Sequence, residues 1–264
     1  MAYFVPLRSE LKVKILLSLL TGGKNLSELK SVFDTRETTI LHVLKELQNL
    51  SLTTKSHGVY GLTSLGFIEA QICKECYAAS TVAADFKEFW LNHDVTAIPC
   101  PLILRLGALK DSSLVKAELS ELGKVHETFM SVLLSSKKIQ GISPIFHPDY
   151  VSVFRQLLSQ GNSVDLILTM DVLSKALESA EAELLQKYAL EEKLRIFVKD
   201  DLRIALTVTE KSFSLGLFGL NGEYDYTTDL VSLNPEAVAW GEDFFRVTLA
   251  ESKRFMPKGP VEAT

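Results

Sequence analysis

The feature that most constrains this chain is a run of three short helical patterns within its first 50 residues. Apolar side chains recur at helical spacing over residues 9–20, and the pair Gly22-Gly23 ends that pattern. Asn25 can cap a second helix, and Asp34 or Thr35 can cap a third that reaches about residue 50. The chain is therefore expected to open with three helices separated by tight turns.

A β-hairpin is predicted directly after the third helix. Two short alternating segments, at residues 52–56 and 59–62, are joined through His57-Gly58. The order of three helices and a hairpin is typical of a winged helix-turn-helix domain, which we expect over residues 1–66. Its third helix would read double-stranded DNA and its hairpin, or wing, would follow the backbone. The expected DNA contacts are the exposed face of that helix and the wing: Arg36, Thr38, Thr39, His42, Lys45, Lys55, Ser56, His57 and Tyr60.

The distribution of charge agrees with a nucleic-acid partner for this segment. The whole chain has a formal net charge of −5, but residues 1–66 hold eight Lys and Arg against five acids. The balance is +3 in that segment and −8 in the remainder. A basic N-terminal segment and an acidic remainder are expected when the first contacts DNA phosphates and the second does not contact DNA.

Two motifs in the N-terminal segment carry a family resemblance. Residues 39–47 (TILHVLKEL) resemble the recognition helix of arsenical-repressor-like winged-helix regulators, and residues 60–66 (YGLTSLG) resemble the Y-x-L-T-x-L-G exit from their wing. The resemblance covers roughly residues 7–66 and implies that the N-terminal half of the third helix enters the major groove. The alternative is an adaptor whose winged helix contacts the transcription machinery without sequence-specific DNA binding.

A long linking helix is predicted over residues 67–94. Its apolar residues recur at alternating steps of four and three, which is typical of a heptad seam. The seam consists of Ile72, Cys76, Ala79, Ala83, Phe86 and Trp90. We expect this helix to form a homodimer that presents two recognition helices to a two-fold operator. The alternative is a helix that packs on its own second domain.

The motif Cys73-Lys74-Glu75-Cys76 permits a redox or metal interpretation, because the two sulfurs would lie one helical turn apart. However, Cys76 occupies a seam position, and no histidine follows at the spacing of a zinc site. We therefore predict structural cysteines, no metal site and no cofactor.

The pattern changes after residue 94, where strands and helices alternate. Pro99 and Pro101 indicate a linker over residues 94–109. Helices are expected at residues 113–137, 148–160, 171–192 and 235–254, and strands at 139–146, 164–169, 194–199, 203–209 and 213–217. Asn221-Gly222 marks a tight turn. The sequence thus predicts an α+β protein whose residues 95–264 form an α/β effector-type domain with a mixed sheet.

This second part also resembles a known family. The segments Cys100-Pro101 to Leu109, 146–150 (FHPDY), 222–225 (GEYD) and 239–242 (AWGE) are similar to the C-terminal domain of archaeal methanogenesis regulatory proteins. The resemblance extends over about residues 95–250 and implies a regulator with a winged helix in front. The layout is also reminiscent of phospholipase-D-like sensory domains, by topology alone.

Catalysis is not expected. Phospholipase-D chemistry needs a lysine two residues after a histidine, and none of the five histidines has one. No phosphate-binding loop or nucleophile elbow occurs either. We predict instead that the domain senses a small-molecule effector or a partner. Ligands of such sheets bind beyond the carboxyl ends of the strands, where the candidates are Phe146, His147, Tyr150, Thr169 and Asp171.

The location of the protein follows from what the sequence lacks. The N-terminal residues show no signal peptide, and the longest apolar stretches are far shorter than the ~20 residues of a membrane span. Three cysteines are too few for a disulfide scaffold. A cytoplasmic protein without a membrane partner is expected.

Overall fold

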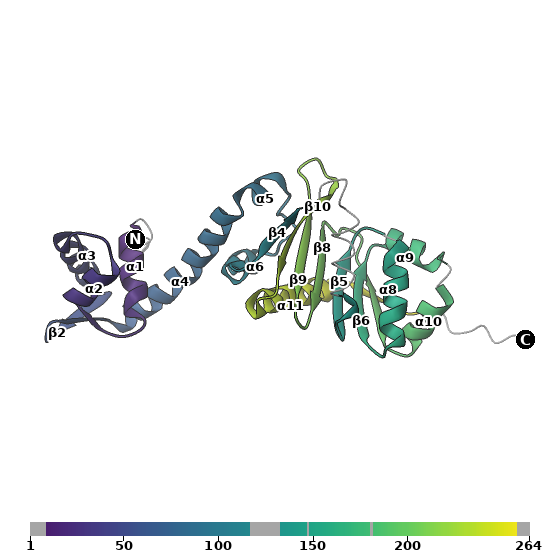
Figure 1. The fold of residues 1–264 in the computed structure, drawn as a ribbon, viewed down its shortest axis with the longest axis horizontal. Helices are drawn as coiled ribbons and strands as arrows, with labels where there is room; N and C mark the ends of the chain where they lie inside the picture. The colour runs from purple at the N-terminus through teal and green to yellow at the C-terminus, as the bar shows by residue number, and fades with distance from the viewer. Residues whose placement is uncertain (1–8, 117–132, 147, 180–181, 258–264) are drawn as a thin grey trace, which may run out of the picture. The chain divides into compact units, whose positions relative to one another are not determined.

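A computed structural model describes residues 9–116, 133–146, 148–179 and 182–257 (Figure 1). The chain forms two compact units, residues 1–80 and 81–264. The boundary between them falls within one helix, α4 (Ser64–Asp85). The predicted three-part division at residues 66 and 94 stays a prediction.

The N-terminal unit contains three helices and a small antiparallel sheet. Its elements are α1 (Glu10–Leu19), β1 (Lys24–Asn25), α2 (Leu26–Val32), α3 (Glu37–Asn49), β2 (Thr53–Ser56), β3 (Val59–Leu62) and the first turns of α4. The strand order is β1-β3-β2. The core is formed mainly by leucines and isoleucines of the three helices, with Leu52, Tyr60 and Ala70. The predicted helices and hairpin are therefore present in the predicted order.

Local capping and turn residues explain the boundaries in this unit. Asn25 begins α2 through a capping box, in which its side chain accepts from the Glu28 amide and the Glu28 carboxylate accepts from the Asn25 amide. The hairpin turn has positive φ at both His57 (49°) and Gly58 (83°), as a type I′ turn requires. One predicted cap is wrong, because α3 begins after Arg36 rather than at Asp34 or Thr35.

The predicted linking helix is interrupted near its end. Phe86 leaves helical geometry at φ −105° and ψ 29°, and a separate short helix, α5 (Lys87–Asn92), follows. Phe86 and Trp90 pack against the core of the C-terminal unit, beside the buried Val82 and Phe89. Part of the apolar surface of Phe86 and Trp90 is therefore used within their own chain, and their place in a dimer seam stays a prediction.

The C-terminal unit is built on an eight-stranded mixed sheet of order β11-β7-β6-β5-β8-β9-β10-β4 (Figure 1). The strands β5, β6 and β7 are parallel, and the other pairs are antiparallel. The strands are β4 (Ser113–Lys116), β5 (Lys138–Ser143), β6 (Ser163–Leu168), β7 (Leu194–Val198), β8 (Ile204–Thr209), β9 (Phe213–Phe218), β10 (Tyr224–Ser232) and β11 (Lys253–Phe255). This agrees with the α+β class and mixed sheet expected from the sequence.

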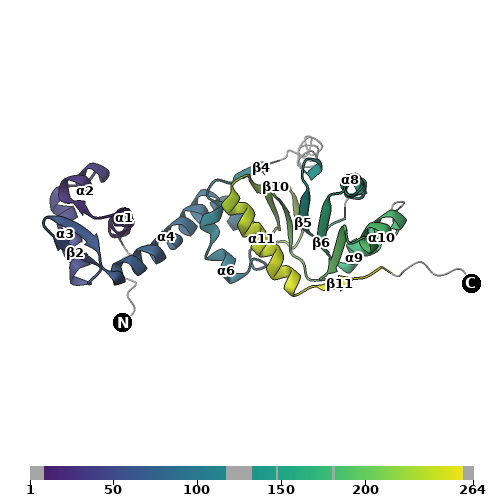
Figure 2. The same ribbon diagram turned by 90° about the horizontal axis from the view of Figure 1, so that it is seen from below.

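Helices cover both faces of this sheet (Figure 2). One face carries α8 (Pro148–Ser159), α9 (Met170–Leu177) and α10 (Ala182–Leu190), and their apolar residues share a core with Val164, Leu166 and Leu168 of β6. The other face carries α5, α6 (Cys100–Ile103), the 3-10 turn η2 (Leu106–Leu109) and α11 (Pro235–Ala250), whose core includes Ile167 of the same strand. Alternate residues of β6 thus face opposite layers.

Several element predictions in this unit are corrected. Residues 113–116, expected to begin a helix, form β4, which pairs with β10. The expected helix over residues 171–192 is two helices, and the end of the last expected helix is β11, which pairs with β7. Strand β10 was not predicted as a strand. The rest of the helix expected at 113–137 lies mostly outside the described residues.

Candidate functional site

The outer face of α3 carries the polar residues that the sequence singled out. Its inner face is closed by Ile40, Val43, Leu44 and Leu47, all buried. The opposite side exposes every predicted contact of this helix: Arg36, Thr38, Thr39, His42 and Lys45. Within the described parts of the chain, Arg36 and Lys45 have no ion-pair partner, whereas His42 Nε2 lies 3.7 Å from Glu46 Oε1. The helix therefore offers two unpaired cations.

The hairpin places three of its four predicted contacts outward. Lys55, Ser56 and His57 are exposed, and Ser56 Oγ lies 3.0 Å from His57 Nδ1. Tyr60 differs, because it is only 3% exposed and packs in the core, with Lys55 Nζ 4.9 Å from its ring centre. The expectation of a direct DNA contact from Tyr60 is corrected on that ground: its ring supports the hairpin from inside.

The predicted ligand residues of the C-terminal unit lie after β5 and β6. Phe146 packs against the core beneath α8, and Tyr150 lies in α8 itself; His147 falls outside the described residues. Thr169 caps α9 by accepting from the Val172 amide at 3.3 Å, and Asp171 pairs with Lys175 at 2.7 Å. The polar groups of Thr169 and Asp171 thus have partners in their own helix.

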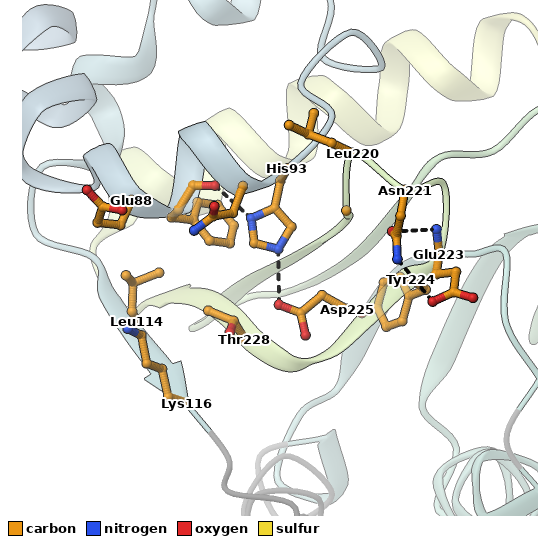
Figure 3. Close-up of a pocket in the computed structure, with 13 residues that line it drawn as sticks. Glu88, His93, Leu114, Lys116, Leu220, Asn221, Glu223, Tyr224, Asp225 and Thr228 are labelled. Atoms are coloured by element: carbon orange, nitrogen blue, oxygen red, sulfur yellow. Dashed lines mark hydrogen bonds and ion pairs between the residues drawn. The ribbon is translucent and has the colours of Figure 1, made fainter.

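A different part of this unit contains a cavity of about 550 Å³ (Figure 3). Three separate segments line it, from α5, from β4 and from the β9–β10 connection with the start of β10. The lining residues are Glu88, Phe89, Asn92, His93, Leu114, Lys116, Gly219, Leu220, Asn221, Glu223, Tyr224, Asp225 and Thr228. This volume is within the range of roughly 300–1,000 Å³ that is usual for small-molecule sites.

A hydrogen-bonded pair, His93 and Asp225, joins two of these segments. His93 is 6% exposed, and its Nδ1 lies 2.6 Å from the carbonyl oxygen of Phe89 while its Nε2 lies 3.0 Å from Asp225 Oδ2 (Figure 3). Burial alone would raise the pKa of Asp225, but hydrogen bonds from Thr227, His93 and Thr228 outweigh it and hold that pKa below its usual value. Both ring nitrogens of His93 therefore lie within hydrogen-bond distance of an oxygen, one from the backbone and one from a carboxylate.

The other polar groups of the cavity divide between its helical and its sheet wall. Glu88 and Asn92 lie one turn apart on α5, whereas Lys116 and Thr228 are direct cross-strand partners on β4 and β10. Neither Glu88 nor Lys116 forms an ion pair with a residue that the structure describes. The cavity therefore contains opposite charges that do not neutralise each other.

Sequence reasoning missed this cavity. Its residues come from positions 88–93, 114–116 and 219–228, and no fixed spacing links them. The only available signal was the polar cluster around Asn221-Gly222, which the sequence indicated as a turn.

The two cysteines of the Cys73–Cys76 motif differ in exposure, since Cys73 is buried and Cys76 is half-buried. Cys73 is 1% exposed, and burial raises the pKa of its thiol, which disfavours the reactive thiolate. In the described ranges, no cluster of three His, Cys, Asp or Glu side chains is arranged to hold a metal ion. Those ranges also contain no helix with the length and apolar character of a membrane span.

The fold and cavity define a two-unit protein in which a three-helix and hairpin unit precedes a three-layered α/β unit with a polar pocket. Residues 5–78 match the family model of the N-terminal domain of methanogenesis regulatory protein FilR1, and residues 122–251 match the model of its middle domain. The chain is 33% identical over 252 residues to the methanogenesis regulatory protein FilR1 of Methanothrix harundinacea (strain 6Ac). That alignment covers 93% of this chain and 56% of the relative, so the chain spans little more than half of its length.

Together these matches support a methanogenesis regulator family for this chain, in agreement with the resemblance noted in residues 95–250. Similar solved structures are TrmBL2, an archaeal chromatin protein (16% identity, TM-score 0.45, 91% of both chains), and NucT from Helicobacter pylori. NucT is 16% identical with a TM-score of 0.42 over 55% of this chain and 98% of its own. Both scores are too low to establish a common fold.

Proposed function

We propose that this chain is a homodimeric DNA-binding transcriptional regulator whose C-terminal unit senses a small molecule or a partner. Its N-terminal unit is then a winged helix, with α3 as the recognition helix and the β2–β3 hairpin as the wing. The observation that carries the proposal is the exposed polar face of α3. On it, Arg36 and Lys45 lie beside Thr38 and Thr39 and have no ion-pair partner among the described residues. Unpaired cations with neighbouring hydroxyl groups suit phosphate and base-edge contacts.

The dimer is proposed to form through the first half of α4. Leu65, Ile68 and Ile72 share one helical face there, and they are 37%, 56% and 49% exposed. Exposed apolar side chains at this spacing are typical of a helix that pairs with a partner helix. A two-fold dimer would present two copies of α3 to half-sites about one DNA turn apart.

The regulator family of the relative supports a sensory rather than a catalytic C-terminal unit. A location in the cytoplasm, with DNA, is part of the same proposal. An effector would act by binding more tightly to one arrangement of the protein than to another, since only differential affinity shifts an equilibrium.

The salt dependence of DNA binding tests this function. Log affinity should fall linearly with log salt concentration, with a slope of about −0.9 for each phosphate neutralised. Arg36→Ala combined with Lys45→Ala should weaken binding and reduce the slope by roughly 2. The matched control, Arg246→Ala with Lys187→Ala, removes two exposed cations from the C-terminal unit and should change neither quantity.

Two results would contradict the proposal. The first is an unchanged slope in the Arg36 and Lys45 double variant, and the second is the absence of salt-dependent DNA binding by the wild-type protein. Either would favour an adaptor that uses this unit for protein contacts.

A further inference from the structure

We propose that the cavity between α5, β4 and β10 binds a small zwitterion, such as a free amino acid, with its ammonium group at Glu88 and its carboxylate at Lys116. The binding site is inferred from the C-terminal unit alone. The further statement that its occupancy is the sensed signal rests on the proposed regulatory function.

The polar atoms of His93 and Asp225 already have hydrogen-bond partners within the protein. His93 lies within hydrogen-bond distance of the Phe89 oxygen and of Asp225, and the second oxygen of Asp225 accepts from the Thr227 amide at 2.8 Å and from its hydroxyl at 2.6 Å. This pair therefore has its hydrogen-bond partners within the wall of the cavity. The carboxylate of Glu223 is likewise held by the Asn221 side chain at 3.0 Å.

Three polar side chains of the lining have no hydrogen-bond or ion-pair partner among the described residues. Glu88 and Asn92 offer a carboxylate and an amide from α5, and Lys116 offers an ammonium from β4. The hydroxyl of Thr228, the cross-strand neighbour of Lys116, is already hydrogen-bonded to Asp225. A simple anion would approach Lys116 but would also meet the negative field of Glu88 and Glu223. A simple cation would be attracted to Glu88 but repelled by the ammonium of Lys116. A zwitterion satisfies both walls at once.

The remaining lining suits the apolar part of such a molecule. Phe89, Leu114 and Leu220 contribute apolar surface to the same cavity. A few convergent polar groups on an otherwise apolar wall are the usual composition of a small-molecule site. An amino acid with an aliphatic side chain therefore fits better than a purely polar zwitterion.

Binding in the cavity can also affect the position of α5 and, through it, the end of α4. The end of α5 is attached to the β9–β10 connection by backbone hydrogen bonds, from the Asp94 amide to Phe218 (2.8 Å) and from the Leu220 amide to Asn92 (3.4 Å). A ligand held by both Glu88 and Lys116 would bridge α5 to the sheet. Because α5 follows α4 directly, occupancy would favour one position of the end of α4.

The test is isothermal titration of the full chain with each of the twenty standard L-amino acids, followed by the N-acetyl and carboxamide forms of any that bind. At least one aliphatic amino acid should bind, and loss of either charge should weaken it at least about tenfold. Glu88→Gln should abolish the preference for the free amine over the N-acetyl form. Lys116→Gln should abolish the preference for the free acid over the carboxamide. Matched controls are Glu183→Gln and Lys211→Gln, both exposed and outside the cavity.

The site is overturned if no amino acid binds, if neutral derivatives bind as well as the parent, or if both cavity variants keep the wild-type affinities. Glu88 and Lys116 are exposed, so neither substitution should unfold the unit, and tryptophan fluorescence checks that. DNA affinity is measured separately, without ligand, so that failure of DNA binding is distinguishable from failure of this site. If an amino acid binds but DNA affinity is the same with and without it, the site stands and its signalling role is overturned.

Discussion

Replacing Asp229 by asparagine is expected to stabilise the C-terminal unit at neutral pH. Asp229 lies on β10 opposite Gly216, and its Oδ1 would be 2.7 Å from a Cβ at that position. Burial raises the pKa of Asp229 from 3.8 to about 6, the nearby charge of Asp225 adds to this, and a 3.4 Å hydrogen bond from Ser214 opposes it. The carboxylate is therefore charged at pH 7 in a place that disfavours the charge.

The magnitude follows from the two pKa values. As pH rises, the unfolded chain releases this proton near pH 3.8, whereas the folded chain holds it until about pH 6. The free energy of unfolding is therefore highest below about pH 4, where Asp229 is protonated in both states, and it decreases as the pH rises through about 6. The difference in pKa corresponds to an upper limit of about 3 kcal/mol. Because the side chain keeps some contact with water, we expect a gain of about 1–2 kcal/mol for Asp229→Asn at pH 7.5.

Urea unfolding followed by tryptophan fluorescence measures this effect selectively. The chain has two tryptophans, Trp90 and Trp240, and both belong to the C-terminal unit. The gain should be present at pH 7.5, shrink through pH 6 and vanish near pH 4. The control, Asp85→Asn, removes an exposed carboxylate and should show no such pH profile. Equal stability of Asp229→Asn and wild type at pH 7.5, or a gain independent of pH, would refute the reasoning.

Three further substitutions test the packing of the two units. Gly66→Ala should destabilise the N-terminal unit by about 3 kcal/mol, since a Cβ there would lie 1.8 Å from the Leu52 oxygen; thermal unfolding by circular dichroism measures it. Arg195→Ala removes two 2.6 Å hydrogen bonds that the guanidinium donates to Asp165, which is 6% exposed. The free energy of unfolding, measured in urea, should fall by about 2 kcal/mol; the half exposure of the guanidinium keeps this loss below that of a fully buried pair. Trp240→Phe removes the 2.9 Å hydrogen bond from the indole N–H to the Leu102 oxygen and leaves a void. The protein should lose about 2 kcal/mol of stability, which is measured as a lower melting temperature.

The N-terminal elements could be predicted because their signals are local. The capping box of Asn25 and Glu28 spans four residues, and the turn at His57-Gly58 spans two. Both fix the backbone without help from distant segments. The burial of Tyr60 was not predictable in the same way, because it depends on how the hairpin packs on the helices.

The edge strands of the C-terminal sheet show the opposite case. Residues 113–116 form a strand only because they pair with residues 228–231 of β10, more than a hundred positions away. β11 likewise exists through its pairing with β7. A window of neighbouring residues contains no information about such a partner, so the local pattern predicted helix in both places.

The cavity was missed for a related reason. The general rule places ligands beyond the carboxyl ends of parallel strands, which selected Thr169 and Asp171 after β6. The cavity instead adjoins the antiparallel strands β10 and β4, next to α5. His93 was expected to end a linking helix, and its pairing with Asp225 joins positions 132 residues apart. Only the tertiary structure brings these groups together.

The break at Phe86 separates α4, through which the dimer is proposed to form, from α5, which packs on the C-terminal core. One variant in each helix can show whether these two roles are separate. Ile72 is 49% exposed on α4, whereas Trp90 packs on the C-terminal core and donates from Nε1 to the Val82 oxygen at 3.3 Å. Ile72→Glu should therefore convert the proposed dimer to monomers in sedimentation without changing the urea unfolding of the C-terminal unit. Trp90→Ala should destabilise that unit by about 3 kcal/mol, which is measured by urea unfolding monitored through the fluorescence of Trp240. The protein that remains folded should stay dimeric. A continuous seam predicts monomers from both variants, and that result would show that α4 and α5 pair along their whole length.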